Sequence, residues 1–380
     1  MFENWYLTEL MNKNVRDIWP LTDNYLLKLI KDILDRTGMS EELKKPVSIS
    51  YLIKKFNYSD KSYSALKWVL ERLKFSNFMD SNEDSDEVKY FFTDKKITYN
   101  DVELYNYCTA QEPGSSHTFK MLKLMADNYE DFLKGNKTGV EIIFSPENIE
   151  IINEYYEKSL FYNANNILGA KVLNNEVDNR DNPHILELGG GMGGGTKQFI
   201  SQRKDEGKSL TNFTYHFTDV ANKMIRNTRK TIESLTGDIS NFEFSKFDFN
   251  KPLTEVGVEE NKYDIIWAVN AIHVAYDLKF TLSELYKVLK PNGVILISET
   301  VRPSEGPMIQ HEFVINTLDD YWNVKLDDEW RPNYGFIKWK NWIKALEAAG
   351  FDIYTTEPNM NEVEKEFNNC YTTVIKGIKK

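Results

Sequence analysis

From residue 183 to 300, short apolar runs alternate with amphipathic stretches. The apolar runs are HILEL, YHFTDV, FEFSKFD, DIIWAV and VILISE, and the stretches TKQFISQRK, ANKMIRNTRKTIESL and FTLSELYKVL carry apolar residues at helical spacing. This alternation predicts a parallel sheet covered by helices, an α/β fold. Further on, WKNWIKALEAAGF predicts a helix closed by Gly350, followed by two last strands in FDIYTTEP and CYTTVIKGI. Such a hairpin-like pair predicts a seven-stranded mixed sheet.

The N-terminal part, residues 1 to about 140, has a helical pattern instead. Apolar residues recur at helix-like spacing in NYLLKLIKDIL, SISYLIKKF and YSALKWVLERLKF. The next segment, SNFMDSNEDSDEVKYFFTDKK, has two short aromatic runs around an acidic turn and predicts a hairpin. Helix, helix and hairpin is the order of a winged helix. The hairpin tip, residues 81–87, is acidic where a wing that contacts phosphates would be basic, so we expect a packing or docking module.

Charge and composition narrow the possible partners and the compartment. A net charge of -11 argues against broad binding to nucleic acid or to an anionic membrane. The N-terminus lacks a signal-peptide pattern, and no apolar stretch is long enough to span a bilayer, so we expect a cytoplasmic protein. Cys108 and Cys370 offer neither a disulfide framework nor metal spacing, so both are expected to be reduced and structural.

The glycine-rich run HILELGGGMGGGT is the strongest signal of a ligand site. It follows the first predicted strand of the sheet, where ligands of α/β folds bind. Its pattern is E-x-G-x-G-x-G, formed by Glu187, Gly189, Gly191 and Gly193. A P-loop is excluded because no G-K-[ST] closes the run. The dinucleotide pattern G-x-G-x-x-G is nominally met, but it is weak evidence in so glycine-rich a stretch.

Acidic residues favour a cationic nucleoside over a dinucleotide. Glu187 can hold the turn or face a cation, and it would repel a pyrophosphate. S-adenosylmethionine carries a sulfonium and an ammonium and no phosphate. The next strand ends at Asp219, which can accept from the ribose hydroxyls, and the third ends at Asp248, an acceptor for the adenine amino group, with Phe247 or Phe249 against the ring. The sequence therefore predicts S-adenosylmethionine as cofactor.

Candidate catalytic residues follow the fourth and fifth strands of the predicted sheet. Asn270 and His273 come after DIIWAV, and VILISE ends at Glu299. Because these strands are expected to be neighbours, His273 and Glu299 should emerge side by side. A carboxylate beside an imidazole sets its tautomer and supports the imidazolium, which makes a general base. His311 with Glu312 has no second ligand at helical spacing, so we expect no metal site.

Several motifs in this order resemble a known family. They are ILELGGGMGGGT, YHFTDV, KYDIIWAVNAIHVAYDL, LYKVLKPNGVILISET, and W-x-x-x-L-x-x-A-G-F from Trp342 to Phe351. They resemble the S-adenosylmethionine-dependent methyltransferase domains of polyketide synthases and polyketide/peptide hybrid synthases. The resemblance extends from about residue 60 onwards. It implies a class I, Rossmann-like methyltransferase fold with an N-terminal helical, winged-helix-like lid domain.

The resemblance also implies domain limits and a reaction. We expect an N-terminal domain over residues 1–140 and a methyltransferase domain over 141–380, with lid helices in 141–180 and the catalytic core in 181–380. In that family a His and Glu pair is associated with carbon methylation of an acyl chain on an acyl carrier protein, and His273 and Glu299 match those positions. The implied partner is an acyl carrier protein or a polyketide synthase module.

Two departures from the family pattern leave the acceptor open. Gly190 and Met192 stand where the family tends to have Ala and Thr, and HEFVINTLDDYW replaces an expected glycine-tryptophan pattern. The alternative within the class is an oxygen or nitrogen methyltransferase acting on a small-molecule natural product. A non-catalytic scaffold on a degenerate fold is the alternative outside it, and the intact Glu187, glycines and Asp219 argue against that.

Overall fold

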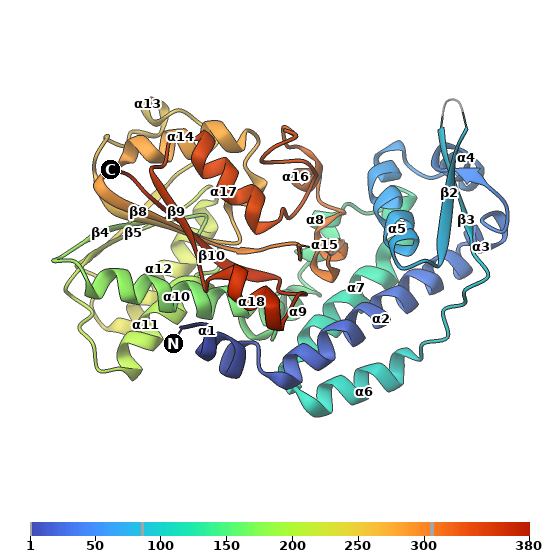
Figure 1. Ribbon diagram of the computed structural model, residues 1–380, viewed down its shortest axis with the longest axis horizontal. Helices are drawn as coiled ribbons and strands as arrows, with labels where there is room; N and C mark the ends of the chain where they lie inside the picture. Colours follow the sequence, from blue (N-terminus) through green and yellow to red (C-terminus); the bar gives the residue numbers. More distant parts are fainter. Residues whose placement is uncertain (1, 85–86, 305–307) are drawn as a thin grey trace. The chain divides into compact units, whose positions relative to one another are not determined.

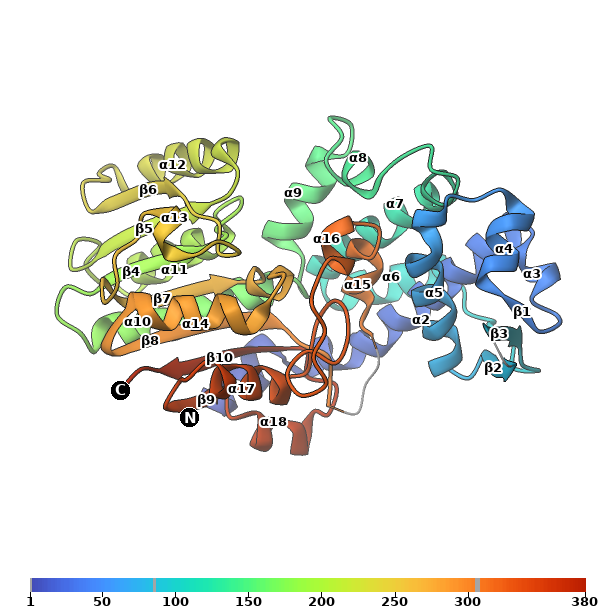
Figure 2. The same cartoon turned by 90° about the horizontal axis from the view of Figure 1, so that it is seen from above.

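The computed structural model describes residues 2–84, 87–304 and 308–380 of the chain, which divides into two compact units. The sheet unit comprises Met1–Leu10, Asn163–Glu305 and Asn323–Lys380. The helical unit comprises Met11–Tyr162 and Gly306–Trp322. Figures 1 and 2 show the elements of each unit in two views. The chain therefore passes between the units more than once.

Specific contacts explain this division. The Tyr6 hydroxyl donates to the Thr372 carbonyl at 2.8 Å and lies 2.7 Å from the Cys370 Sγ, which ties the first ten residues to the sheet unit. In the helical unit, the buried ring of His311 stacks on Trp19 with 5.9 Å between ring centroids. Neither contact has a signal in the sequence pattern.

A seven-stranded mixed sheet forms the centre of the sheet unit and confirms the predicted sheet. Its order is β6-β5-β4-β7-β8-β10-β9. The five strands from β6 to β8 are parallel, and β10 is antiparallel to both of its neighbours. The bounds are β4 His184–Leu188, β5 Thr214–Asp219, β6 Phe242–Lys246, β7 Tyr263–Val269, β8 Leu289–Thr300, β9 Ile353–Glu357 and β10 Thr372–Ile378.

Helices cover both faces of this sheet, which is why its central strands are apolar on both sides. Helices α10, α11 and α12 lie on one face, and α14 and α17 on the other (Figure 1). Their bounds are α10 Asn163–Asp178, α11 Gly194–Asp205, α12 Asn222–Thr236, α14 Leu278–Val288 and α17 Trp339–Ala348. The shorter elements are α1 Phe2–Trp5, η1 Tyr6–Leu10, α13 Leu253–Val256, η4 Ile272–Val274 and α18 Met360–Glu366.

The helical unit contains the predicted winged-helix order. Helix α2, strand β1, helices α4 and α5 and the hairpin β2–β3 follow one another, and the strands pair antiparallel in the order β1-β3-β2. Residues 85 and 86 of the predicted acidic tip lie outside the described residues. The bounds are α2 Lys13–Arg36, α3 Met39–Glu42, β1 Val47–Ser48, α4 Ile49–Phe56, η2 Asp60–Ser62, α5 Tyr63–Phe75, β2 Met79–Asp84 and β3 Glu87–Phe92.

The remaining helices of this unit include part of the expected lid segment. They are α6 Asp101–Gln111, η3 Pro113–Ser115, α7 Ser116–Leu133, α8 Gly139–Ile143, α9 Ile149–Lys158, α15 Gln310–Ile315 and α16 Asp319–Trp322. The segment 141–180 was expected to be one or two helices. It contains the end of α8, all of α9 and all of α10, and it is divided between the two units.

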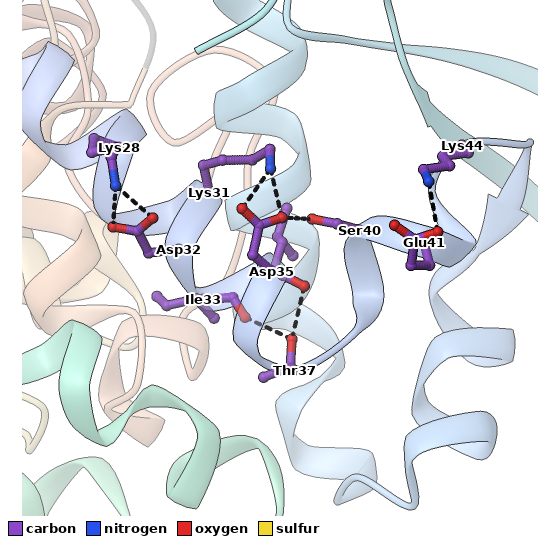
Figure 3. A network of polar contacts seen from close by, with 10 residues as sticks. Lys28, Lys31, Asp32, Ile33, Asp35, Thr37, Ser40, Glu41 and Lys44 are labelled. Carbon is purple, nitrogen blue, oxygen red and sulfur yellow. Dashed lines mark hydrogen bonds and ion pairs between the residues drawn. The ribbon is translucent and has the colours of Figure 1, made fainter. Parts of the chain in front are cut away.

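Helix α2 shows how one element serves both core and surface. Its apolar residues are buried, whereas its outer face carries Lys28–Asp32 and Lys31–Asp35 ion pairs four residues apart (Figure 3). Asp35 also accepts from the Ser40 hydroxyl at 2.5 Å. Exposed pairs of this kind each contribute only a few tenths of a kcal/mol, about 0.3–0.5, so burial of the apolar face holds the helix in place. Within the described residues, every helix is too short or too polar to cross a lipid bilayer.

Candidate active site

The glycine turn connects β4 to α11 at the carboxyl edge of the sheet. Gly191 has a φ of +54°, and among the described residues only the Gly189 carbonyl oxygen comes within 4 Å of the position a Cβ would take there, at 3.9 Å. The backbone at Gly191 is therefore open to an approaching ligand. A side chain at this position would be strained and would fill that space.

Gly190 is required for a different reason. A Cβ at this position would lie 2.2 Å from the nearest ring atom of Phe217, a fully buried residue of β5. The Phe217 ring occupies the volume that an alanine would need. The departure of Gly190 from the family pattern is thus matched by a large neighbour in the next strand.

Glu187 lies beneath the glycine turn with only 1% of its surface exposed. Its carboxylate accepts from the Thr196 hydroxyl at 2.5 Å and from the Tyr215 hydroxyl at 2.9 Å. Burial raises the pKa of the Glu187 carboxyl to about 7, and these hydrogen bonds partly offset the rise. Of the two roles considered for Glu187, this geometry supports holding the turn, because the carboxylate joins β4 to the first turn of α11.

Asp219, at the end of β5, is bonded directly to the glycine turn. Its carboxylate accepts from the Gly191 amide at 2.9 Å and from the Ala221 amide at 2.7 Å. Each carboxylate oxygen has a second lone pair that can accept another hydrogen bond. Asp219 therefore holds the backbone in place and retains the capacity to bind a hydroxyl group.

Two residues that follow β6 lie near the same edge. Asp248 is partly exposed, and its Oδ1 accepts from the Asn250 amide at 3.1 Å. Phe249 is 8% exposed, and its ring comes within 3.9 Å of the position a Cβ would take on Gly189. The structure thus brings Phe249, like Asp219, close to the glycine turn.

Asn270 closes the end of β7 in a left-handed conformation, with a φ of +47°. Its main-chain amide donates to the Ser298 carbonyl at 2.8 Å, and its Oδ1 accepts from the Thr300 amide at 2.7 Å. The Nδ2 group is buried and has no hydrogen-bond partner among the described residues. A buried amide donor without a hydrogen-bond partner lowers the free energy of unfolding unless a ligand accepts from it.

His273 and Glu299 are in contact, as the neighbouring strands β7 and β8 led us to expect. His273 Nδ1 lies 2.8 Å from Glu299 Oε2, and the carboxylate is fully buried. Glu299 Oε1 accepts from the main-chain amides of Ala271 and His273 at 3.1 and 3.3 Å. One carboxylate therefore holds both the ring and the turn that carries it. Among the described residues, none is hydrogen-bonded to His273 Nε2.

The glycine turn and the histidine turn meet through one side chain. A Cβ on Gly189 would lie 2.9 Å from the Cβ of Ala271, whose amide is bonded to Glu299. The glycine turn, which is predicted to bind the nucleoside, and the turn that carries His273 are therefore adjacent.

Sequence reasoning missed several residues that support this site. Thr196 and Tyr215 hold the Glu187 carboxylate, and the Trp267 indole donates to the Tyr215 hydroxyl at 2.8 Å. Arg331 and Phe336 contact His273 from a loop with no regular pattern. Except for Thr196, each of these residues is more than 25 positions away in the sequence from the residue it contacts. A short spacing motif could therefore not have identified them.

Two other histidines have their own surroundings. His216 is bonded to the hydroxyls of Tyr263 and Ser245, and burial lowers its pKa to about 4. His311 is buried in the helical unit, where burial lowers its pKa to about 3. No group of three or more His, Cys, Asp or Glu side chains suited to a metal ion occurs within the described ranges.

Part of the chain matches a known protein family. Residues 186–295 match the family model described as a methyltransferase domain. This range runs from the strand that carries Glu187 to the start of the apolar part of β8. Residues 186–295 thus form a methyltransferase domain, and the chain has the class I methyltransferase fold that the motifs predicted.

The most similar relatives include synthases far longer than this chain. It is 26% identical over 232 residues to the polyketide synthase-like protein Preu9 of Preussia isomera, a match of 61% of this chain and 10% of the relative. It is 27% identical over 227 residues to the methyltransferase calH of Penicillium decumbens, which covers 60% of this chain and 57% of that protein. The chain thus spans a small part of the synthases and about half of the shorter relative.

Solved structures share the fold over almost the whole chain. The CurJ carbon methyltransferase superposes with a TM-score of 0.82 at 19% identity, covering 99% of this chain and 96% of that one. The carbon methyltransferase domain of the citrinin polyketide synthase has a TM-score of 0.78 at 18% identity, covering 99% and 93%. These likenesses confirm the predicted fold class, including a helical N-terminal region.

Proposed function

We propose that this methyltransferase transfers a methyl group to the α-carbon of a β-ketoacyl chain held on an acyl carrier protein. His273 is the general base in this proposal, and Glu299 supports it. The observation that carries the proposal is the 2.8 Å contact between His273 Nδ1 and the buried Glu299 carboxylate, adjacent to the glycine turn. A base is needed for carbon methylation because the carbon must first lose a proton.

The arrangement suits proton removal by His273. With Nδ1 donating to Glu299, Nε2 carries the lone pair that accepts the proton. The carbon between a ketone and a thioester is acidic, because both carbonyl groups delocalise the charge that remains. The fully buried Glu299 carboxylate stabilises the resulting imidazolium. His273 later releases the proton to solvent. The imidazole is then neutral again.

The residues at the edge of the sheet fit S-adenosylmethionine, which supplies an electrophilic methyl group when bound. Gly191 leaves the backbone open, Asp219 can accept from ribose hydroxyls, and Asn270 Nδ2 is a buried donor without a partner within the described ranges. Asp248 and Phe249 are assigned to the adenine. The full set of proposed cofactor residues is Glu187, Gly189, Gly191, Gly193, Asp219, Asp248, Phe249 and Asn270, with Glu187 acting from beneath the turn.

The acceptor distinguishes this proposal from its alternative. The alternative is oxygen or nitrogen methylation of a free small-molecule natural product, for which a histidine base would serve equally well. Likeness to the CurJ carbon methyltransferase and to the carbon methyltransferase domain of the citrinin polyketide synthase supports carbon as the acceptor atom. Dependence of turnover on a phosphopantetheinylated carrier protein separates the two, and the mass and fragmentation of the product locate the added methyl group.

Substitution of the base tests the mechanism. His273→Ala should lower turnover by a factor of about 10² or more, because a positioned general base contributes that much. The affinity for S-adenosylmethionine, measured by calorimetry, should stay nearly unchanged. The partly exposed His117→Ala, in the helical unit, is a matched control. Unchanged turnover in His273→Ala would remove this residue from the mechanism.

Partners and compartment are part of the same proposal. A carrier protein or a polyketide synthase module is the partner that relatives such as Preu9 suggest. The net charge of -11 argues against nucleic-acid and membrane partners, and a cytoplasmic location is proposed with them. The helical unit is assigned a lid or docking role.

A further inference from the structure

The loop between α16 and α17 reaches His273 with two side chains. Arg331, 1% exposed, donates from Nη2 to the main-chain carbonyl of His273 at 2.5 Å. Phe336, 2% exposed, lies against the imidazole with 4.7 Å between ring centroids and 51° between ring planes. Both residues belong to the sheet unit, as His273 does.

The loop itself is anchored on the structure around His273. Asp327 and Arg331 exchange main-chain hydrogen bonds at 2.9 and 3.0 Å. The Lys325 amide donates to the Tyr276 carbonyl at 2.7 Å, three residues after the histidine. At its other end, the Arg302 amide donates to the Ile337 carbonyl at 3.2 Å. The loop is therefore bonded near both of its ends, at one end to a residue that follows His273 and at the other to a residue that follows Glu299.

These contacts restrain two parts of His273 that Glu299 does not bind, the main-chain carbonyl and the ring face. Glu299 binds the His273 amide and Nδ1, whereas Arg331 binds the carbonyl and Phe336 covers the ring. Rotation of the ring about its Cβ–Cγ bond would break the hydrogen bond to Glu299 and move the ring against Phe336. The Nε2 lone pair consequently points in one direction.

We propose that Arg331 and Phe336 are positioning residues for the base. Arg331 sets the turn that carries His273, and Phe336 sets the orientation of the imidazole and keeps water from the ring face it covers. This rests on the proposed function, in which His273 removes a proton from the acceptor. Misplacement of a reacting group by about 1 Å can cost on the order of 10²-fold in rate, so loss of either contact should lower kcat without touching cofactor or acceptor directly.

Phe336→Leu tests the ring contact, because leucine keeps the site apolar and removes the aromatic face. With S-adenosylmethionine and a β-ketoacyl carrier protein, we expect kcat to fall roughly tenfold or more, with KM for the acceptor and affinity for S-adenosylmethionine nearly unchanged. Arg331→Met tests the turn in the same assay. Phe351→Leu is the matched control, because Phe351 is 4% exposed in the same unit and its ring contacts Tyr286.

A double-mutant cycle separates positioning from a general structural effect. If Phe336 acts through His273, Phe336→Leu should cause no further loss of kcat in a His273→Ala background. Equal losses in both backgrounds would overturn the inference. An unchanged kcat in both Phe336→Leu and Arg331→Met would also overturn it.

A spectroscopic measurement tests the inference independently of the acceptor. In ¹⁵N-histidine-labelled protein, the Nδ1 proton shared with Glu299 should give a resolved signal that His273→Ala removes and Phe351→Leu retains. We expect Phe336→Leu to shift or broaden that signal, and an unchanged signal would overturn the inference. If His273→Ala itself leaves turnover intact, the proposed function fails, while this signal still reports whether Phe336 orients the ring.

Discussion

At the scale of single residues, the site depends on carboxylates that bind the protein's own backbone. Asp219 accepts from the Gly191 amide, and Glu299 accepts from the amides of Ala271 and His273. The sequence identified both carboxylates because each ends a predicted strand. It could not show that they are bonded to turns, since such bonds depend on the register of neighbouring strands. Arg331 and Phe336 were missed for the same reason, because nothing in the spacing of a loop indicates its partner.

Glu187 should make stability depend on pH. Its folded-state pKa is raised from 4.5 to about 7, so the contribution of this group is fully present below pH 4.5 and is lost as the pH rises through about 7. A rise of this size corresponds to about 3 kcal/mol. Glu187→Gln cannot ionise, so its free energy of unfolding should fall less between pH 5 and 8 than that of the parent protein.

Urea unfolding at a series of pH values measures this difference. Glu347→Gln, at an exposed position on α17, serves as the control and should keep the pH dependence of the parent. An identical slope for Glu187→Gln and the parent protein would mean that Glu187 does not carry the effect.

At the scale of elements, the period of apolar residues was the reliable signal. The five parallel strands were predicted because runs such as DIIWAV are apolar on both faces, as buried strands must be. Element ends were harder to predict. Strand β8 begins at Leu289, directly after α14 ends at Val288, whereas the helical pattern continues through Leu289. Helix α18 lies between β9 and β10, so the final pair of strands is not joined by a tight turn.

The packing of β5 against the glycine turn leads to a prediction at this scale. Gly190→Ala places a Cβ 2.2 Å from the Phe217 ring, so the strand or the turn must shift. We expect a loss of about 1–3 kcal/mol in the free energy of unfolding, the usual cost of overpacking a core. Weaker binding of S-adenosylmethionine should accompany it, because the neighbouring Gly191 moves with the turn.

Phe217→Leu in the Gly190→Ala background is the complementary variant, since it returns space to the new methyl group. It should recover part of the lost stability, measured by thermal unfolding of all four combinations. Additive losses in the double variant would show that Phe217 is not the obstacle.

At the scale of the whole molecule, each unit is assembled from separate segments of the chain. The sheet unit uses three segments and the helical unit two. The sequence pattern does not show on which core residues 2–10 and 308–322 pack. That choice depends on partners distant in the sequence, such as Cys370 for Tyr6 and Trp19 for His311. The domain limits expected at residues 140 and 180 therefore stay predictions from the sequence pattern.

Attachment of the N-terminal segment can be measured. Tyr6→Phe removes the donor to the Thr372 carbonyl, and we expect a loss of about 1 kcal/mol in the free energy of unfolding, the usual net value of one buried hydrogen bond. Tyr276→Phe, at a position that is 54% exposed, is the control and should be nearly neutral. Equal stability of Tyr6→Phe and the parent in chemical denaturation would contradict this account of the segment.

Residues 2–10 and 323–380 belong to the same unit, and Figure 1 marks both chain ends on it. A polypeptide fused to either end would therefore be joined to the sheet unit, and the helical unit would receive no external linker. Tension transmitted along such a fusion would act across β10 and the first helices, leaving the fold of the helical unit unloaded.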